Sequence, residues 1–327
     1  MSERVKGILF VLLAIASLTP WVTAPIALVA GLAFALTLGT PAPAKVKQAQ
    51  TFSLQAAVVG LGAGMNLAVV GRVGVLGVGQ TLVTLVVTLS LALLLARVLR
   101  TERTTSLLIG VGTAICGGSA IAAVAPAIGA KSEQSSLSLA VVFLLNAAAL
   151  IIFPKLGTFV GLSAEQFGLW CALAIHDTSS VVGASNEFGP VALAIGTTVK
   201  LARALWIIPL TLVLARVWKA EGEAKGQAKR PWFILGFVAA AALVTWVPAL
   251  SDVGHLVHEG ARHVLVASLF LVGAGVSRDA LKKVGARPLA LGVVLWAVVA
   301  TGSLAAIRFG LAAVPSLEAP ASSSQSR

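Results

Sequence analysis

The sequence predicts an all-α polytopic membrane protein of about eleven transmembrane helices. Of its 327 residues, 58% are hydrophobic and only 11% are charged, whereas soluble proteins usually carry about 25% charged residues. The mean hydropathy of +0.97 agrees with this imbalance. So little polar surface suits a lipid solvent, in which a helix satisfies its own backbone hydrogen bonds.

Apolar segments follow one another along the whole chain, and each is close to the roughly 20 residues that a membrane crossing needs. The loops between them are short, so we expect residues 1–314 to form a single transmembrane domain. The serine-rich tail 315–327 is predicted to be disordered and periplasmic. The predicted spans are 6–20, 22–39, 51–70, 73–98, 106–130, 135–153, 165–186, 190–217, 232–250, 261–277 and 286–311.

The basic residues predict how the chain is oriented. The formal net charge is +12, but lysine and arginine gather in the short loops, as topology determinants do. Most of them fall on one side if the N-terminus is cytoplasmic and the C-terminus periplasmic. The first apolar segment lacks a cleavage motif and is predicted to remain as a helix. We therefore expect a protein of the bacterial inner membrane, with the lipid bilayer as a partner and no nucleic acid.

A short repeat relates two parts of the chain. The run from Leu61 to Gly64, continuing to Val73 and Gly74, matches the run from Val272 to Gly275, continuing to Val284 and Gly285. The predicted topology makes the two copies inverted, which is typical of secondary transporters. Small residues that pack helices closely would give part of the same pattern.

The predicted span 106–130 has a polar and glycine-rich centre. Paired glycines at Gly117 and Gly118 favour a break in the helix, and Ser119 could cap a new half-helix after it. The N-terminus of such a half-helix would attract an anion at the middle of the membrane. Close helix packing is the alternative explanation for these glycines.

The predicted span 165–186 contains five consecutive polar residues, which a lipid-facing helix would not tolerate. The block should therefore face protein, water or a solute, and Asp177, Thr178 or Ser179 could cap a second half-helix. The pair His176 and Asp177 is also a candidate for proton coupling. A buried network that only stabilises the fold remains the alternative. The block is His176, Asp177, Thr178, Ser179 and Ser180.

Two cations lie in the middle of the predicted span 190–217. Lys200 and Arg203 are three residues apart and share a helix face. Two neighbouring buried cations repel unless a negative group joins them, so we expect Asp177 or a bound anion beside them. Snorkelling to the membrane surface is the alternative.

The remaining reactive residues do not form a familiar enzyme or metal motif. Cys116 and Cys171 both lie in apolar segments, where a disulfide framework is not expected. His255, His258 and His263 fall in what the sequence predicts to be a polar loop and a helix start. We expect no metal, no cofactor and no ATP-binding loop.

Three motifs resemble the YeiH-like family of bacterial inner-membrane proteins, which carries a sulfate-exporter label. They are TAICGGSAIAAVAP at 113–126, IHDTSSVVGAS at 175–185 and VKLARALWIIP at 199–209. Many family members have His-Glu followed by Ala-Gln at the position of His176 to Ser179. The family is similar to sodium/proton antiporters and bile-acid symporters. This resemblance implies inverted repeats, discontinuous helices that cross at the bilayer midplane, and elevator-like movement.

The sequence thus predicts a secondary active transporter that exports a small anion such as sulfate, sulfite or an organic sulfonate. A proton or sodium ion is the expected coupling ion, and a homodimer is left open. A cation/proton antiporter using Asp177, or an intramembrane enzyme using Ser119 or Cys116 with His176, are the alternatives. The predicted substrate-binding residues are Gly117, Gly118, Ser119, His176, Asp177, Thr178, Ser179, Ser180, Lys200 and Arg203.

Overall fold

The computed structural model describes residues 3–65, 67–218, 232–275 and 285–315, and its regular structure is helical. The first helices are α1 (Glu3–Ala16), α2 (Ala24–Thr37), α3 (Pro43–Gly62), α4 (Leu67–Val98), α5 (Arg103–Ala114), α6 (Gly118–Ala127) and α7 (Ser132–Val160). They are followed by α8 (Ala164–Ala174), α9 (Thr178–Phe188), α10 (Pro190–Ala204), α11 (Ile207–Val217), α12 (Trp232–Trp246), α13 (Ser251–Ala274) and α15 (Ala286–Arg308).

In the described part of the chain, five helical stretches are long and apolar enough to cross a membrane. They are Thr81–Val98, Glu133–Val160, Pro190–Val217, Ser251–Ala274 and Ala286–Arg308. Shorter apolar helices cover Ala24–Thr37, Gly118–Ala127 and Leu235–Trp246. This pattern agrees with the predicted multi-pass membrane protein.

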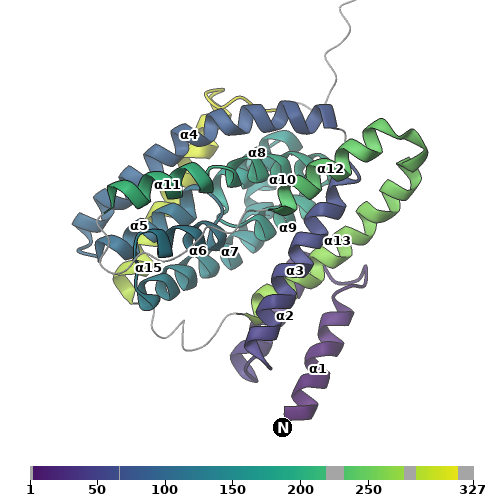
Figure 1. The fold of residues 1–327 in the computed structure, drawn as a ribbon, viewed down its shortest axis with the longest axis horizontal. Helices are drawn as coiled ribbons and strands as arrows, with labels where there is room; N and C mark the ends of the chain where they lie inside the picture. The colour runs from purple at the N-terminus through teal and green to yellow at the C-terminus, as the bar shows by residue number, and fades with distance from the viewer. Residues whose placement is uncertain (1–2, 66, 219–231, 276–284, 316–327) are drawn as a thin grey trace, which may run out of the picture.

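One side of the molecule is a panel of four helices, α2, α3, α12 and α13 (Figure 1). Glycine lets these helices approach closely. A Cβ atom at Gly273 of α13 would clash with the carbonyl oxygen of Leu28 on α2. A Cβ atom at Gly62 of α3 would likewise clash with the carbonyl oxygen of Phe237 on α12. The other helices, α4 to α11 and α15, form a second group, here named the hairpin bundle.

Helices α5 and α6 form a re-entrant hairpin. The start of α7, which follows α6, lies beside the start of α5: Ser138 Oγ donates to the carbonyl oxygen of Thr105 at 3.2 Å, and the Gln134 amide donates to the Glu102 carboxylate. Because α5 leads the chain about 18 Å away from that point, α6 must bring it back. This pair is named hairpin 1.

Helices α8 and α9 form a second re-entrant hairpin, named hairpin 2. The rings of Phe167 and Phe188, near the two ends of this segment, stack with centroids 3.8 Å apart. In one continuous helix these residues would lie about 30 Å apart. Gly196 of α10 also packs against both arms, next to Gly168 of α8 and Ser185 of α9.

The two hairpins enter the bundle from opposite ends of α7. Hairpin 1 begins and ends near the N-terminal end of α7, as the Ser138 contact shows. The Phe167 and Phe188 rings of hairpin 2 pack against Gly157, near the C-terminal end of α7. The tips meet at the middle of α7, where Val142 packs against Gly117 and Asn146 binds hairpin 2.

The prediction of helix breaks is confirmed, but each segment folds back as a hairpin and does not continue in one direction as a single span. The interruptions fall at residues 115–117 and 175–177, where the sequence placed them. Each arm is about 15–18 Å long, which is half the thickness of a bilayer core. An apolar run of about 25 residues therefore fits two half-length arms as well as one crossing, and hydropathy does not separate the two.

Several predicted boundaries also need correction. Helix α3 begins at Pro43, so Lys47 lies on a helix and not in a loop. Helix α13 begins at Ser251, which places His255 and His258 on a helix as well. The predicted span 190–217 contains a turn between α10 and α11.

Two further sequence predictions fall outside the described residues. These are the predicted disordered tail beyond Pro315 and the part of the repeat at Lys283 and Val284. The described ends of the repeat lie at the C-terminal ends of α3 and α13, at Gly62 and Ala274.

The hairpin topology predicts which side of a membrane the open end of each hairpin faces. A cysteine introduced at Lys131 should react with a membrane-impermeant maleimide from the same side as one at Arg100, and one at Glu165 from the opposite side. Single-cysteine labelling in intact cells and inverted vesicles measures this, since the native Cys116 and Cys171 are buried. If residue 165 labels from the side of residue 100 and residue 131 from the other, the segments cross.

Candidate functional site

The tip of hairpin 2 is held by side chains that satisfy the free ends of its helices. Asn146 Oδ1 of α7 accepts hydrogen bonds from the backbone amides of His176 and Asp177 at 3.1 and 3.2 Å. Asp177 is the N-cap of α9: its Oδ1 accepts from the Ser180 amide at 2.9 Å, and its Oδ2 from the Ser179 hydroxyl. A carboxylate here also matches the positive end of the helix dipole.

The tip of hairpin 1 has a different N-terminus. The N-cap of α6 is Gly117, whose φ of 60° suits glycine, and no side chain caps the helix. The prediction that Ser119 caps it is therefore wrong, because Ser119 lies inside the first turn. Ser119 is exposed, and no side chain of the described residues caps the amide end of α6. This end is the more suitable of the two for a negative ligand.

Arg203 joins the carbonyl ends of both hairpins. One guanidinium nitrogen donates to the carbonyl oxygens of Ala172 and Leu173 at the end of α8, at 2.8 and 2.9 Å. The other terminal nitrogen donates to the carbonyl oxygen of Ala114, the last residue of α5. The side chain is fully buried. A planar guanidinium with several donors suits this task, since the last carbonyls of a helix have no partner within it.

Lys200 completes the same arrangement. Its ammonium donates to the carbonyl oxygen of Ile175 at 2.6 Å and of Ala172 at 3.4 Å, and its side chain is also fully buried. The prediction that Asp177 pairs with one of these cations is not what the described residues show, because their salt bridges do not include Lys200, Arg203 or Asp177. The negative ends of α5 and α8 take that place.

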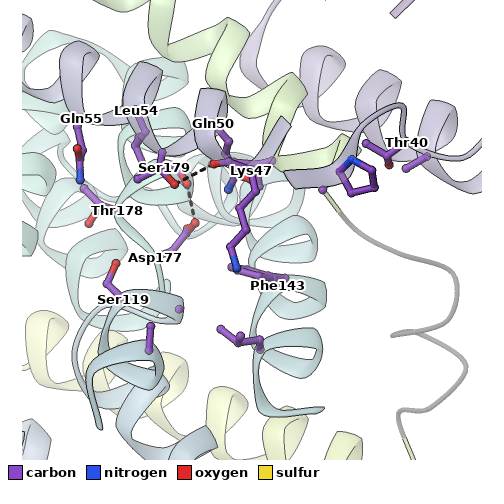
Figure 2. Close-up of a pocket in the computed structure, with 18 of the residues that line it drawn as sticks. Thr40, Lys47, Gln50, Leu54, Gln55, Ser119, Phe143, Asp177, Thr178 and Ser179 are labelled. Carbon is purple, nitrogen blue, oxygen red and sulfur yellow. Dashed lines mark hydrogen bonds between the residues drawn. The ribbon is translucent and has the colours of Figure 1, made fainter. Parts of the chain in front are cut away.

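A cavity of about 690 Å³ separates the hairpin tips from the panel (Figure 2). Its deep end is formed by both tips, and its other wall by α3 and the end of α2. Figure 2 shows Lys47 extending from α3 into the cavity, with Ser119, Asp177 and Thr178 on the opposite side. The polar residues of the lining are Thr40, Lys47, Gln50, Thr51, Gln55, Ser119, Asp177, Thr178 and Ser179.

The structure divides the predicted site residues into two groups. Gly118, Ser119, Asp177, Thr178 and Ser179 line the cavity. The others lie behind the tips and outside the described lining: Gly117, His176, Ser180, Lys200 and Arg203.

Buried polar atoms remain behind the tips. Within the described residues, both ring nitrogens of His176 and the hydroxyl of Ser180 have no hydrogen-bond partner. His176 makes no hydrogen bond to Ser119 or Cys116 among the described interactions, so the geometry adds no support for the enzyme alternative.

The residues on the panel side of the cavity were not predicted from the sequence. Lys47, Gln50 and Gln55 recur at helical spacing on one face of α3, at positions i, i+3 and i+8. A polar stripe on an apolar helix was the available signal, but the misplaced span 51–70 put Lys47 and Gln50 in a loop.

The histidines near α13 do not form a metal site in the described residues. His258 Nδ1 instead lies 3.0 Å from the carbonyl oxygen of Leu61, at the end of α3. This contact explains why Gly64 is needed nearby, since a Cβ there would clash with the His258 ring.

Comparisons with known proteins identify the family. A family model described as "Conserved hypothetical protein 698" matches residues 7–292, which is most of the chain. The chain belongs to this family. Its curated relatives are UPF0324 membrane proteins, and this is the YeiH-like family that the sequence motifs resemble.

The similarity extends over whole proteins. A UPF0324 membrane protein of Bdellovibrio bacteriovorus is 53% identical over 311 residues, which cover 94% of this chain and 95% of the relative. One of Geobacter sulfurreducens is 44% identical over 303 residues, covering 93% and 96%. No solved structure matches the chain.

The contacts of Arg203 predict a structural effect of its replacement. Arg203→Ala should destabilise the fold by at least about 3 kcal/mol, because it removes the donor of the buried Ala114 and Leu173 carbonyls and leaves Ala172 with Lys200 alone. Arg203→Lys should recover only part of this, since a lysine lacks the second arm of the fork. Thermal stability and the monodisperse fraction in detergent measure the effect.

Arg216→Ala is the matched control, because Arg216 is exposed and bonds only the Leu212 carbonyl of its own helix. If Arg203→Ala were as stable as this control and lost only ligand binding, the carbonyl contacts would not be what fixes the tips.

Proposed function

We propose that this UPF0324 protein is a secondary active transporter that exports a small anion from the bacterial cytoplasm across the inner membrane. Sulfate, sulfite and organic sulfonates are the candidate solutes, with a proton or sodium ion as the coupling ion. One observation carries the proposal: a cavity with polar groups in its lining lies at the meeting point of two oppositely directed hairpins. Non-helical backbone at membrane depth is tolerated where it lines such a cavity.

The packing supports an inverted repeat with a permuted order. The series α2, α3, α4, hairpin 1, α7 corresponds to α12, α13, α15, hairpin 2, α10–α11. Equivalent pairs of helices pack alike in the two series. The packing of α3 on α12 corresponds to that of α13 on α2, and the packing of α4 on α5 to that of α15 on α8. The packing of α4 on α10 corresponds in the same way to that of α15 on α7. Gly62 and Gly273, matched by the sequence repeat, make the equivalent close contacts to α12 and α2.

The sequences of the two hairpin tips also correspond to each other residue by residue. Ala114 and Ala174 each end the first arm, Ile115 and Ile175 follow them, and a serine lies four positions further on in each case. Because the hairpins enter from opposite ends of α7, these copies are inverted, as the proposal requires.

The proposal has the cavity open on the side of the N-terminus. The lining includes Gly39, Thr40 and Pro43, and a Cβ atom built at Gly39 would lie 3.6 Å from Lys6 Nζ of α1. With the N-terminus cytoplasmic, the solute would enter from the cytoplasm. With two hairpins in place of two crossings, Lys131 moves to the cytoplasmic side and Lys155 to the opposite side. One basic residue replaces the other, so the excess of basic residues on the cytoplasmic side stays the same.

The far end of the cavity is closed where hairpin 2 meets the panel. Glu187 Oε1 accepts from the backbone amide of Ala24, the first residue of α2, at 3.3 Å. Asn186 Oδ1 accepts from Arg262 Nε of α13 at 2.8 Å. Movement of the hairpin bundle along the panel would break these contacts and open that side, as an elevator-like mechanism requires.

Flux through the purified protein tests the proposal. Protein reconstituted in liposomes should move labelled sulfate, sulfite or an organic sulfonate, and a proton or sodium gradient should drive it. Asp177→Asn should fold, because asparagine is an equally good N-cap, but should lose the pH dependence of transport. An unchanged pH profile in this variant would remove Asp177 from coupling.

The same assay separates the rival function. Cation-driven proton movement that no anion affects would support a cation/proton antiporter in which Asp177 carries the ion. Asp177 lines the cavity, which is the observation that keeps this rival open. Glu165→Gln is a matched control for removal of a carboxylate from the same hairpin, because Glu165 lies in the first turn of α8 and outside the described lining.

The closed end predicts the effect of a cross-link. A short bifunctional thiol reagent that joins cysteines introduced at Asn186 and Arg262 should reduce flux at least tenfold. Solute should still bind from the N-terminal side. The Arg262→Cys single variant treated with the same reagent is the control. Full flux in the cross-linked protein would show that hairpin 2 and the panel do not separate during transport.

A further inference from the structure

We infer that the preferred solute is an organic oxyanion with a short hydrocarbon body, and not bare sulfate. The inference rests on the proposed transport function and specifies its substrate class. The cavity offers one side-chain cation and the amide end of α6 for a negative head, and an apolar wall for the remainder of the molecule.

The volume is the first argument. At about 690 Å³ the cavity lies within the range of about 300–1,000 Å³ that is typical of sites for organic ligands. A bare sulfate would occupy a small part of it and leave the rest to water. Sulfate is also a dianion, which is costly to remove from water unless many donors converge on it.

The charges of the lining are the second argument. Lys47 is the cation among the described lining residues, and no carboxylate of the described salt bridges pairs with it. Asp177, the carboxylate of the lining, already accepts from Ser179 and Ser180. Lys47 and the amide end of α6 are opposed by the Asp177 carboxylate in the same lining, and this balance suits a singly charged sulfonate or carboxylate better than a dianion.

The apolar wall is the third argument. Leu139 and Phe143 of α7, Leu54 of α3, Phe233 of α12 and Val272 of α13 line the cavity. Figure 2 shows the Lys47 side chain extending from α3 into the cavity that this wall lines. A head group at Lys47 would therefore place an alkyl chain against apolar side chains, where each buried methylene strengthens binding.

A homologous series of alkanesulfonates tests the inference. Binding to the purified full-length protein should tighten by about fourfold per added methylene from methanesulfonate to butanesulfonate. Sulfate should bind at least tenfold more weakly than butanesulfonate. Competition against a labelled sulfonate, or ligand-induced thermal stabilisation, measures the series.

Two variants assign the parts of the site. Phe143→Ala should flatten the dependence on chain length, whereas Lys47→Gln should weaken every member of the series by a similar factor. Lys45→Gln is the control for Lys47, because Lys45 lies two residues earlier on α3 and is exposed outside the described lining. Unaltered thermal stability in the absence of ligand shows that each variant folds.

The outcomes distinguish this inference from the transport function. Sulfate binding as tightly as butanesulfonate, with a flat series, would overturn the inference while anion flux left the function intact. Tighter binding of 2-aminoethanesulfonate than of ethanesulfonate would overturn it in favour of a zwitterion that also uses Asp177. No binding or flux of any anion would overturn both.

Discussion

The fold depends on how four helix ends are satisfied inside a membrane domain. Each re-entrant hairpin turns at mid-depth and leaves carbonyl groups at the end of one arm and amide groups at the start of the next. Arg203 and Lys200 bind the carbonyl ends, and Asn146 and Asp177 bind the amide groups of hairpin 2. Without these partners the hairpins would carry unpaired polar groups, which lipid or apolar packing does not compensate.

The carbonyl ends and the amide ends of the tip helices have different partners, and this difference decides which groups face the cavity. The carbonyl ends are held by fixed cations that are fully buried and lie outside the described cavity lining. The amide ends face the cavity, where Asp177 caps α9 while α6 has no side-chain cap. The cations that the sequence marks as the anion site thus stabilise the scaffold, and the positive groups open to a solute are the amide end of α6 and Lys47.

The sequence predicts the helix breaks and the Asp177 cap of this protein better than it predicts the path of the chain. The breaks after Ile115 and Ile175 could be located because glycine pairs and polar blocks are unfavourable in a continuous apolar helix. The cap by Asp177 follows from the same local rule. Re-entry could not be found this way, because it depends on contacts such as Phe167 with Phe188 that only the folded chain brings together. The panel wall was missed because Pro43, a favourable first residue of a helix, was not used to place the start of α3.

Arg203 also limits how access to the cavity can change. Its guanidinium binds α5 of hairpin 1 and α8 of hairpin 2 at once, so opening either hairpin alone would expose buried carbonyls or leave a buried cation without partners. Among the described residues, the hydrogen bonds found between the panel and the bundle do not involve the tips. They join Glu187 with Ala24, Arg262 with Asn186, and the Leu67 amide of α4 with the Thr245 hydroxyl of α12. The elevator-like motion proposed above would keep both hairpins together and leave the contacts of Arg203 intact.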